Sequence, residues 1–472
     1  MTGFDIARSL ESPAILVALG LIAAGLLYVL VQEVRKIPAK LFVLMATAFV
    51  DMVGVLMVIP LLPFYVKQLG GEGFDVYGFH VGVGLISGLI VSAFTVAQLM
   101  SAPMWGRFSD RFGRRPALLI ALGASAMAYL IFGFATSLFL LFLSRVVQGA
   151  GGGTVGVIQA YVADTVEPHQ RARALGWLSA ATNLGVALGP VLGSFAVRVG
   201  EQDIWPGPGT LRLGAAAPGL AAAVICLLNM VFAAKYLKES KQMHASHAAP
   251  PMRSARSALW RVISHSGEPS ARLIWTYSIA IGAFQGITAV LALFLNAQFQ
   301  VNEKTIGFFF MYIGAISVFA RVLLLGRAVD WLGEPRLSRI GITLLALGVG
   351  TMPLAGSLPL LALSVAMIPL GTAFTFPCVT ALLTRVISPS EQGLYMGLQQ
   401  TFGGVARIVA PLFYGWAFDT LGIRVPFFFS AVFVFATIFL GLGLDRFARP
   451  RSAAAAKAES TASAVTELKA VE

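Results

Sequence analysis

One acidic residue stands inside a long apolar run near the start of the chain. Asp51 lies in the segment FVDMVGVLMVIP, residues 49–60, and no neighbouring charge in the sequence pairs with it. A lone carboxyl group in apolar surroundings can exchange a proton or bind a cation. We interpret Asp51 as a proton-exchanging group. The alternatives are that Asp51 forms a structural pair with an arginine or an amide, or that it is a sodium ligand.

Two arginines are embedded in similar runs. Arg145, in FLSRVVQGAGGG, lies about 10 Å into its helix at 1.5 Å per residue, and Arg407, in FGGVARIVAP, lies near the middle of its run. A guanidinium at such depth is costly and normally faces the protein interior. Arg145 is expected to assist proton release or to orient Gln148, unless it snorkels outward. Arg407 is expected to contact a substrate or balance charge, or to form an interhelix hydrogen bond.

Uncharged polar residues within the apolar runs are candidates for a cavity lining. Each is as readily a hydrogen bond between helices as a ligand contact. They are Gln98, Gln148, Asn183, Tyr277, Gln285, Gln399 and Gln400.

A short charged segment, WGRFSDRFGRRPALL, separates two of the apolar runs. Its glycines permit a tight turn, and its acid can accept hydrogen bonds from the exposed amides of a helix N-terminus. Such an acid contributes about 1–2 kcal/mol when partly buried, so it can act as a latch that favours one conformation. The alternative is that the arginines only set membrane topology. The motif residues are Gly106, Asp110, Arg111, Gly113, Arg114 and Arg115.

A second segment, GWLSAATNLGVALGPVLGS, spaces glycines four residues apart. This spacing leaves one helix face almost free of side chains, which allows close packing against a neighbouring helix. Pro190 removes one backbone hydrogen bond and favours a kink. The role is structural first, and it restricts leakage. The residues are Gly176, Gly185, Gly189, Pro190 and Gly193.

The elements that must position these residues are membrane helices. The chain is 57% hydrophobic and only 12% charged, with a mean hydropathy of +0.81, whereas soluble domains carry about 25% charged residues. Uncharged runs of about 20 residues predict membrane-spanning helices. The predicted spans are 13–32, 41–66, 81–103, 117–136, 138–162, 174–197, 213–234, 273–296, 305–325, 338–356, 359–383, 393–417 and 425–445. Of the 22 Asp and Glu residues, Asp51 alone falls in the middle of a predicted span, and the other 21 lie in loops, in tails or at helix ends.

The positive charge of the chain, +12, follows the loops. One set of alternate loops holds most Lys and Arg residues, which predicts that these loops, and the C-terminus, are cytoplasmic. This placement puts the N-terminus outside and argues against nucleic-acid binding. The opposite loops and the N-terminal segment hold only Arg8, Lys67, Arg198, Arg212, Lys304 and Arg424. Span 13–32 is expected to be an extra helix rather than a cleaved signal peptide, because VRKIPAK follows it as a stop-transfer signal.

The remaining twelve spans form an internal repeat. Gly106, Asp110 and Gly113 recur as Gly326, Asp330 and Gly333 in GRAVDWLG. Parallel repeats of this kind place a substrate site between the halves near the bilayer midplane. The expected units are an extra helix and linker at 1–40, a six-helix bundle at 41–235, a cytoplasmic linker at 236–270, a six-helix bundle at 271–446 and a disordered or weakly helical tail at 447–472.

These motifs resemble those of the major facilitator superfamily, over about 41–446. The charged segment is similar to that family's signature loop, Arg145 to its membrane-embedded arginine motif, and the glycine segment to the signature of its drug:proton antiporter branch. In the antiporter signature, Ser194 stands where a final glycine is usual. The first helix resembles that of the tetracycline exporters, but Ala128 replaces an acid that these carry before the tyrosine at position 129, which argues against tetracycline itself.

The resemblance implies an all-α polytopic protein of the bacterial cytoplasmic membrane, a monomer, that exports small amphipathic or cationic molecules in exchange for protons, as in drug resistance. Asp51 and Arg145 would couple the proton. The alternatives are a carrier of a defined metabolite, siderophore or lipid without proton antiport, and a non-transporting receptor or scaffold. No enzyme motif is present, and GAGGG at 149–153 lies inside a span rather than after a strand. Cys226 and Cys378 lie in apolar runs, so neither a disulfide nor a metal site is expected, and no cofactor.

Overall fold

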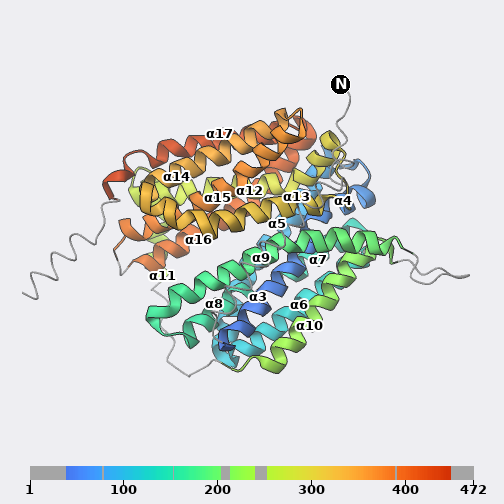
Figure 1. Ribbon diagram of the computed structural model, residues 1–472, viewed down its shortest axis with the longest axis horizontal. Coiled ribbons are helices and arrows are strands. Elements are labelled where there is room, and N and C mark those ends of the chain that lie inside the picture. The colour runs from blue at the N-terminus through green and yellow to red at the C-terminus, as the bar shows by residue number, and fades with distance from the viewer. Residues whose placement is uncertain are drawn as a thin grey trace, which may run out of the picture.

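The protein is described by a computed structural model that covers residues 39–76, 79–152, 154–202, 213–239, 252–388 and 391–447 (Figure 1). These residues form two groups of helices, one from each half of the chain. The predicted extra helix 13–32 and the tail after residue 447 lie outside the described residues. Cys226 and Cys378 are free and buried.

The first half begins with a span that bends at two prolines, α3 (Ala39–Val58), the short helix η1 (Ile59–Leu61) and α4 (Leu62–Gly70). A hairpin of β1 (Gly73–Val76) and β2 (Phe79–Gly82) then leads into α5. The remaining elements are α5 (Val83–Phe112), α6 (Arg114–Gly133), α7 (Leu138–Ala150), α8 (Thr154–Thr165), α9 (Pro168–Gly200), η2 (Gly214–Ala216) and α10 (Ala217–Tyr236).

The second half has the same plan, preceded by α11 (Met252–Ser264) in the segment predicted as a linker. Its elements are α12 (Pro269–Phe299), α13 (Ile306–Phe319), the π-helical turn η3 (Ala320–Leu324), α14 (Leu325–Thr351), η4 (Met352–Leu354), α15 (Leu358–Val386), α16 (Gln392–Thr420), α17 (Val425–Gly441) and η5 (Leu444–Phe447). The chain reverses inside α14 at Gly333, whose φ of 72° is available to glycine at little cost. One continuous element therefore holds parts of two predicted spans.

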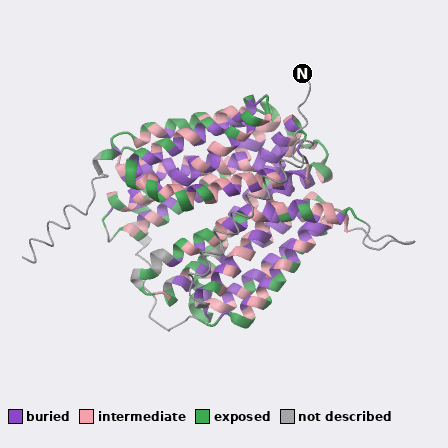
Figure 2. Ribbon diagram, in the orientation of Figure 1, coloured by how far each residue is buried: buried purple, intermediate pink, exposed green. Residues whose placement is uncertain are grey.

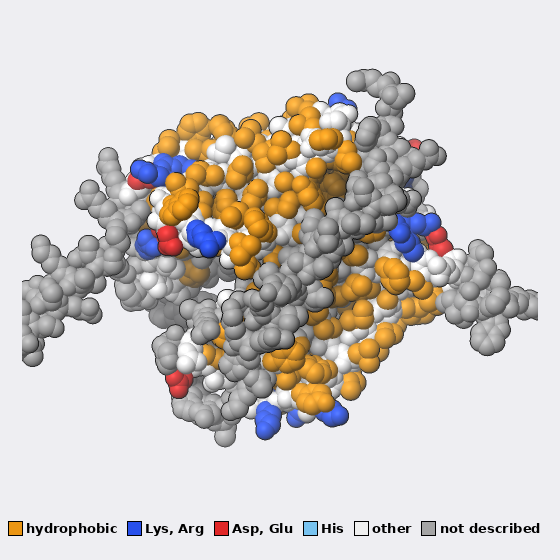
Figure 3. Space-filling view, in the orientation of Figure 1, with side chains coloured by type: hydrophobic (Ala, Val, Ile, Leu, Met, Phe, Trp, Pro, Cys, Tyr) orange, Lys and Arg blue, Asp and Glu red, His pale blue; other side chains and the backbone are white. Residues whose placement is uncertain are grey.

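Eight helices among the described residues are long and apolar enough to cross a membrane, and Ile306–Leu354 counts as one of them although it contains this turn. The shorter apolar helices are α7 and α17. Hydrophobic side chains cover the face seen in Figure 3, and charged side chains gather towards its ends. This distribution fits an all-helical protein that crosses a bilayer, as predicted.

Predicted span 138–162 is broken into α7 and α8, because the glycines from Gly149 onward interrupt the helix. The freed carbonyl oxygens are satisfied by side chains of α5. Trp105 donates to the oxygen of Ala150 at 2.6 Å and Ser101 to that of Gly149 at 3.3 Å, while Gln98 Nε2 lies 3.5 Å from that of Gly152. In this conformation Gln98 thus has the structural role that was the alternative to a ligand contact.

The glycines of α9 bring this helix against the backbone of α3. A Cβ atom on Gly185 would lie 2.6 Å from the carbonyl oxygen of Phe49, and one on Gly193 would collide with that of Met57. Only a face without side chains permits this approach. The contact fixes α3 by one face, and Asp51 lies on α3 in the same stretch.

The two bundles meet along α5 with α16 and along α9 with α13. We call the end of the molecule that carries the β1–β2 hairpin the hairpin end, and the end that carries α11 the linker end (Figure 1). Buried residues fill the interior of each bundle, and exposed residues are frequent at the linker end (Figure 2).

Candidate functional site

Asp51 is buried inside the first bundle, with 3% of its surface exposed. Its Oδ2 accepts a hydrogen bond of 2.9 Å from the hydroxyl of Thr154, the first residue of α8. Its Oδ1 is buried and has no hydrogen-bond partner. The partner of the carboxylate is therefore a hydroxyl group rather than Arg145, and one oxygen remains available to a proton or another ligand.

A second hydrogen bond lies beside this pair. Gln148, on α7, donates to the hydroxyl of Tyr129, on α6, at 2.9 Å. This hydroxyl packs against α3 one turn from Asp51, because a Cβ on Gly54 would lie 3.2 Å from it. Tyr129 is fully buried and the oxygen of the Gln148 amide has no partner.

Arg145 completes this polar cluster. It is 2% exposed, its guanidinium lies 5.5 Å from the centre of the Phe132 ring, and its Nε is 3.3 Å from the hydroxyl of Ser144. Its Nη2 is buried without a partner. The side chain thus stays inside the bundle instead of reaching the surface, so the alternative that it snorkels outward does not describe this conformation.

Asp51, Tyr129, Arg145, Gln148 and Thr154 form what we call the Asp51 cluster. Buried polar atoms normally have partners, and leaving one unpaired costs about 1–3 kcal/mol. This cluster leaves three such atoms, on Asp51, Arg145 and Gln148. An acid, a guanidinium and an amide with unused hydrogen-bonding capacity can bind and release protons, water or a polar group of a substrate.

The second bundle holds another group of predicted residues. Arg407, on α16, lies with Nη2 3.4 Å from the hydroxyl of Tyr277, on α12, whose ring meets the edge of Phe376. Gln399, one helix turn before Gly403, is fully buried and accepts from Thr380 at 3.3 Å, while its Nε2 has no partner. We call Arg407, Tyr277 and Phe376 the Arg407 cluster.

The other predicted cavity residues join neither cluster. Asn183 donates to the carbonyl oxygen of Ser179 in its own helix at 2.6 Å. Gln285 is half-buried on α12, and Gln400 is exposed on α16. The buried glutamine beside the Arg407 cluster is thus Gln399.

The charged segment forms the end of α5 and the start of α6, which Gly113 separates, and it is held within its own bundle. Arg114 pairs with Asp110 at 2.7 Å and with Asp164 at 2.9 Å. The exposed amides at the start of α6 bind Glu239, through Arg114 N at 2.8 Å and Arg115 N at 3.2 Å, rather than the predicted Asp110. The side chain of Asp110 is 62% exposed. A latch by Asp110 across the bundles therefore stays a prediction for another conformation.

Three further residues of this charged segment were singled out. Gly113 has a φ of 105°, and a Cβ there would press on the carboxylate of Glu239. Gly106 has open space around it, and Arg111 lies over the ring of Phe112.

The second half carries the matching ion pair with its charges exchanged. Glu334 stands at the position that corresponds to Arg114, and Arg385 at the position that corresponds to Asp164, and the two form an ion pair. Both pairs tie the linker ends of neighbouring helices within one bundle. Asp330 is exposed.

At the hairpin end an acid joins the two bundles. Asp419, in the last turn of α16, accepts hydrogen bonds from the amides of Gly84 at 2.9 Å and Leu85 at 2.8 Å, the first turn of α5. Negative charge is favourable at a helix N-terminus, where amides lack partners. Glycines at positions 82 and 84 make room for the carboxyl group.

Ser194 makes a second connection at this end. Its hydroxyl donates to the carbonyl oxygen of Glu303 at 2.7 Å and accepts from the amide of Gly307 at 2.9 Å. Lys304 and Glu201 add an ion pair of 2.6 Å. The serine that replaces a usual glycine of the motif thus bonds α9 to the start of α13.

Two glycines of the interface helices have open space around them at the linker end. On α9, Gly176 has no neighbouring atom within 4 Å of a Cβ position, and the same is true of Gly397 at the matching position of α16. The bonds of Asp419 and Ser194 between the bundles thus lie at the hairpin end, whereas these two glycines at the linker end face open space.

Among the residues of these sites that the sequence analysis missed are Thr154, Asp419 and Tyr129 as a cluster member. A hydroxyl in a span and an acid at a helix end are both common, and neither carries a signal by type alone. The glycine break before Thr154 was the available hint, because it marks the point where two half-helices change direction.

Comparisons with known protein families, sequences and structures give matches of one kind. The profile of the Major Facilitator Superfamily matches residues 44–357 and 322–471. Multidrug resistance protein 2 of Bacillus subtilis (strain 168) is 28% identical over 408 residues, 85% of this chain and 93% of that protein. The class C tetracycline resistance protein of Escherichia coli is 28% identical over 376 residues, 79% of this chain and 88% of that protein. Among solved structures, the human organic anion transporter MFSD10 (TETRAN) matches with a TM-score of 0.63 at 24% identity, over 86% of this chain and 100% of that chain.

Proposed function

The chain belongs to the Major Facilitator Superfamily, and we propose that this transporter exports small amphipathic or cationic molecules in exchange for protons. The observation that carries the proposal is the buried carboxylate of Asp51, whose Oδ1 has no partner. The names of the two bacterial relatives, a multidrug and a tetracycline resistance protein, support the substrate class.

Proton exchange would centre on the Asp51 cluster. In the protonated state Asp51 is neutral, and Thr154 holds its second oxygen. A cationic substrate and a proton compete for the same carboxylate, so arrival of one favours release of the other. Arg145 and Gln148 offer polar atoms that can stabilise the carboxylate or a water molecule during this exchange.

Alternating access would use the two ends of the molecule. The loops at the linker end carry most of the basic residues, so this end would face the cytoplasm. The described conformation, closed by Asp419 and Ser194 and open at the linker end, then corresponds to an inward-open state. In the outward-open state these contacts break, and Asp110 becomes free to meet the other bundle.

The test is transport in proteoliposomes with an imposed pH gradient, with tetraphenylphosphonium as the lipophilic cation and an internal pH indicator. Wild-type protein should move protons and the cation in opposite directions, and Asp51→Asn should abolish the dependence on the gradient. Glu72→Gln, an exposed acid of the hairpin end, is the matched control. Gradient-driven flux that survives in Asp51→Asn would overturn the coupling role of Asp51.

A second candidate is a carrier of a defined metabolite, siderophore or lipid without proton antiport. The half-buried guanidinium of Arg407, 3.4 Å from the Tyr277 hydroxyl, favours it, because such a group suits an anionic substrate. Transport that ignores the pH gradient in wild type and is lost in Arg407→Gln would favour this candidate.

A further inference from the structure

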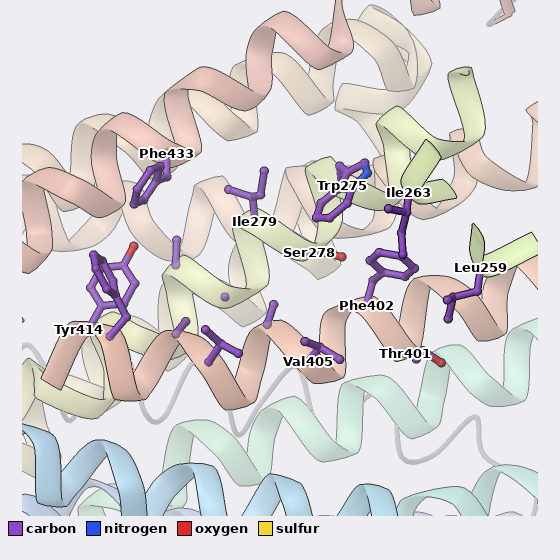
Figure 4. A pocket seen from close by; sticks show the side chains of 16 residues that line it. Leu259, Ile263, Trp275, Ser278, Ile279, Thr401, Phe402, Val405, Tyr414 and Phe433 are labelled. Atoms are coloured by element: carbon purple, nitrogen blue, oxygen red, sulfur yellow. The ribbon is translucent and has the colours of Figure 1, made fainter. Parts of the chain in front are cut away.

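The second bundle has an apolar groove on its surface, formed in part by α12 and α16, the helices that also carry Tyr277 and Arg407. It lies between α16 and α17, with α12 as its floor, and has a volume of about 680 Å³ (Figure 4). Its walls include Phe402 and Val409 of α16 and Phe433 of α17, and Ile279 rises from the floor. The polar lining consists of the hydroxyl-bearing residues Ser278, Thr401 and Tyr414.

The groove opens to the surroundings of the protein. Val405 is 52% exposed, Val409 56% and Phe433 46%. Its volume lies within the range of about 300–1,000 Å³ that small-molecule sites occupy. In a membrane protein this surface contacts lipid, so the natural occupant is an acyl chain.

The helix α11 borders the linker end of this groove. Its Leu259 and Ile263 line the groove, and its Ala258 and Val262 pack into the second bundle. Trp275, another groove residue, donates to the carbonyl oxygen of Val262 at 3.3 Å and so ties α11 to α12. The helix is therefore a fixed part of the groove.

The outer face of α11 has the composition of a helix that lies at a membrane surface. Trp260 is 68% exposed and Ile263 47%, and Arg256 and Arg261 are exposed on the same short helix, whose sequence contains no acid. Basic amphipathic helices with Trp and Leu on one face bind at the interface and favour anionic lipids. Glu268 and Tyr395 lie near Arg261, so Arg256, one helix turn from Leu259 and Trp260, is the better placed cation.

We propose that this groove holds an acyl chain of an anionic phospholipid whose phosphate group is bound by Arg256. The lipid would come from the leaflet at the linker end. Charge complementarity selects the occupant, because an apolar groove that ends near exposed arginines matches a lipid that has an acyl chain and an anionic head group. Bulk lipid without preference and a second copy of the chain are the competing occupants.

The test uses full-length protein in nanodiscs of phosphatidylcholine that contain brominated phosphatidylglycerol or brominated phosphatidylcholine. Bromine quenches nearby tryptophan fluorescence, and the signal of the groove is the difference between the parent protein and a Trp260→Phe/Trp275→Phe variant. The anionic lipid should quench at about fivefold lower mole fraction, the preference expected for one basic residue at a membrane surface. Arg256→Gln should abolish this preference, and Lys235→Gln, an exposed cation of the first bundle, should leave it unchanged.

A second variant tests the groove itself. Val409→Phe fills exposed space without touching the core, and it should reduce quenching by both lipids. Equal quenching by the two lipids in the parent protein would mean bulk contact only. A preference for the anionic lipid that survives in Arg256→Gln would place the head group at another site. If nanodiscs that hold two copies of the chain protect the groove tryptophans from both brominated lipids, the groove is an interface between copies. Each of these results overturns the proposal.

Discussion

The contact of Asp419 with the start of α5 makes a prediction about conformational equilibrium. Asp419→Ala removes an acceptor from two amides, those of Gly84 and Leu85, at 2.9 and 2.8 Å. Replacing a capping acceptor by alanine costs about 0.5–2 kcal/mol, typically about 1. Because the contact exists only while the hairpin end is closed, the substitution should shift the population towards the open state about fivefold.

The assay is a distance measurement between spin labels at Glu72 and Leu421, exposed residues that follow α4 and α16 at the hairpin end. Both native cysteines are buried, so introduced ones take the label. The longer-distance population should grow in Asp419→Ala. Thr420→Ala, which removes an exposed hydroxyl that donates to the carbonyl oxygen of Trp416 within α16, is the control. An unchanged distance distribution in Asp419→Ala would refute the assignment of Asp419 as a closing contact.

The pH should shift the equilibrium between the closed and open states through Asp419. Burial raises the pKa of Asp419, and the hydrogen bonds from Leu85 and Gly84 and the charge of His80 oppose this shift. The closed state thus holds the proton more tightly than a solvated carboxyl group does. Acidification should favour the closed state, and its population should fall as the pH rises through the pKa of Asp419. Asp419→Asn keeps a neutral acceptor, so it should stay closed and lose this pH dependence.

His80 is another ionisable group near Asp419, and its hydrogen bond with Asp75, at 2.9 Å, raises the pKa of its imidazole. His80→Gln separates the two contributions. A pH dependence that persists in Asp419→Asn and vanishes in His80→Gln would transfer the effect to the histidine.

Three further substitutions have expected outcomes. Gly193→Val should lower the melting temperature and disrupt transport, because its side chain would press into the backbone of α3, whereas Gly106→Ala, in open space, should change the melting temperature little. Arg114→Glu should lower the thermal stability of the first bundle. Adding Asp164→Arg should restore it, because the second half already uses the reversed ion pair. If the double variant does not recover, the charged segment needs the original order of the two charges. Ser194→Gly should enlarge the open population in the spin-label assay, since two hydrogen bonds between the bundles are lost.

The features that the sequence predicted share one physical cause, the absence of water in a bilayer. Each spanning segment must be apolar and helical, so hydropathy located the helices, and the glycine spacing at 185–193 indicated the close packing that α9 makes with α3. An isolated charge is conspicuous in such a segment, which is why Asp51, Arg145 and Arg407 could be singled out.

Connections between the spans, and contacts that depend on which helices become neighbours, were not predicted. The hairpin β1–β2 and the helix α11 lie between spans, where hydropathy gives no signal. The partners of Asp51 and Arg114 depend on which helices become neighbours, and Thr154 and Glu239 are distant in sequence. Asp419 was grouped with the acids at helix ends, because only the packing of α16 against α5 makes its position special.

The location of the Asp51 cluster limits how a proton can be coupled to movement. Asp51, Tyr129, Arg145, Gln148 and Thr154 all belong to the first bundle, so a rigid rocking of the bundles would leave their mutual distances unchanged. Rocking alone can therefore alter only which end of the molecule supplies water or substrate to Asp51. A change within the cluster requires its helices to move relative to one another, and the glycine-rich break between α7 and α8 permits such a movement of α8. Because the hydrogen bond from Thr154 to Asp51 crosses from α8 to α3, its making and breaking would report such a movement directly.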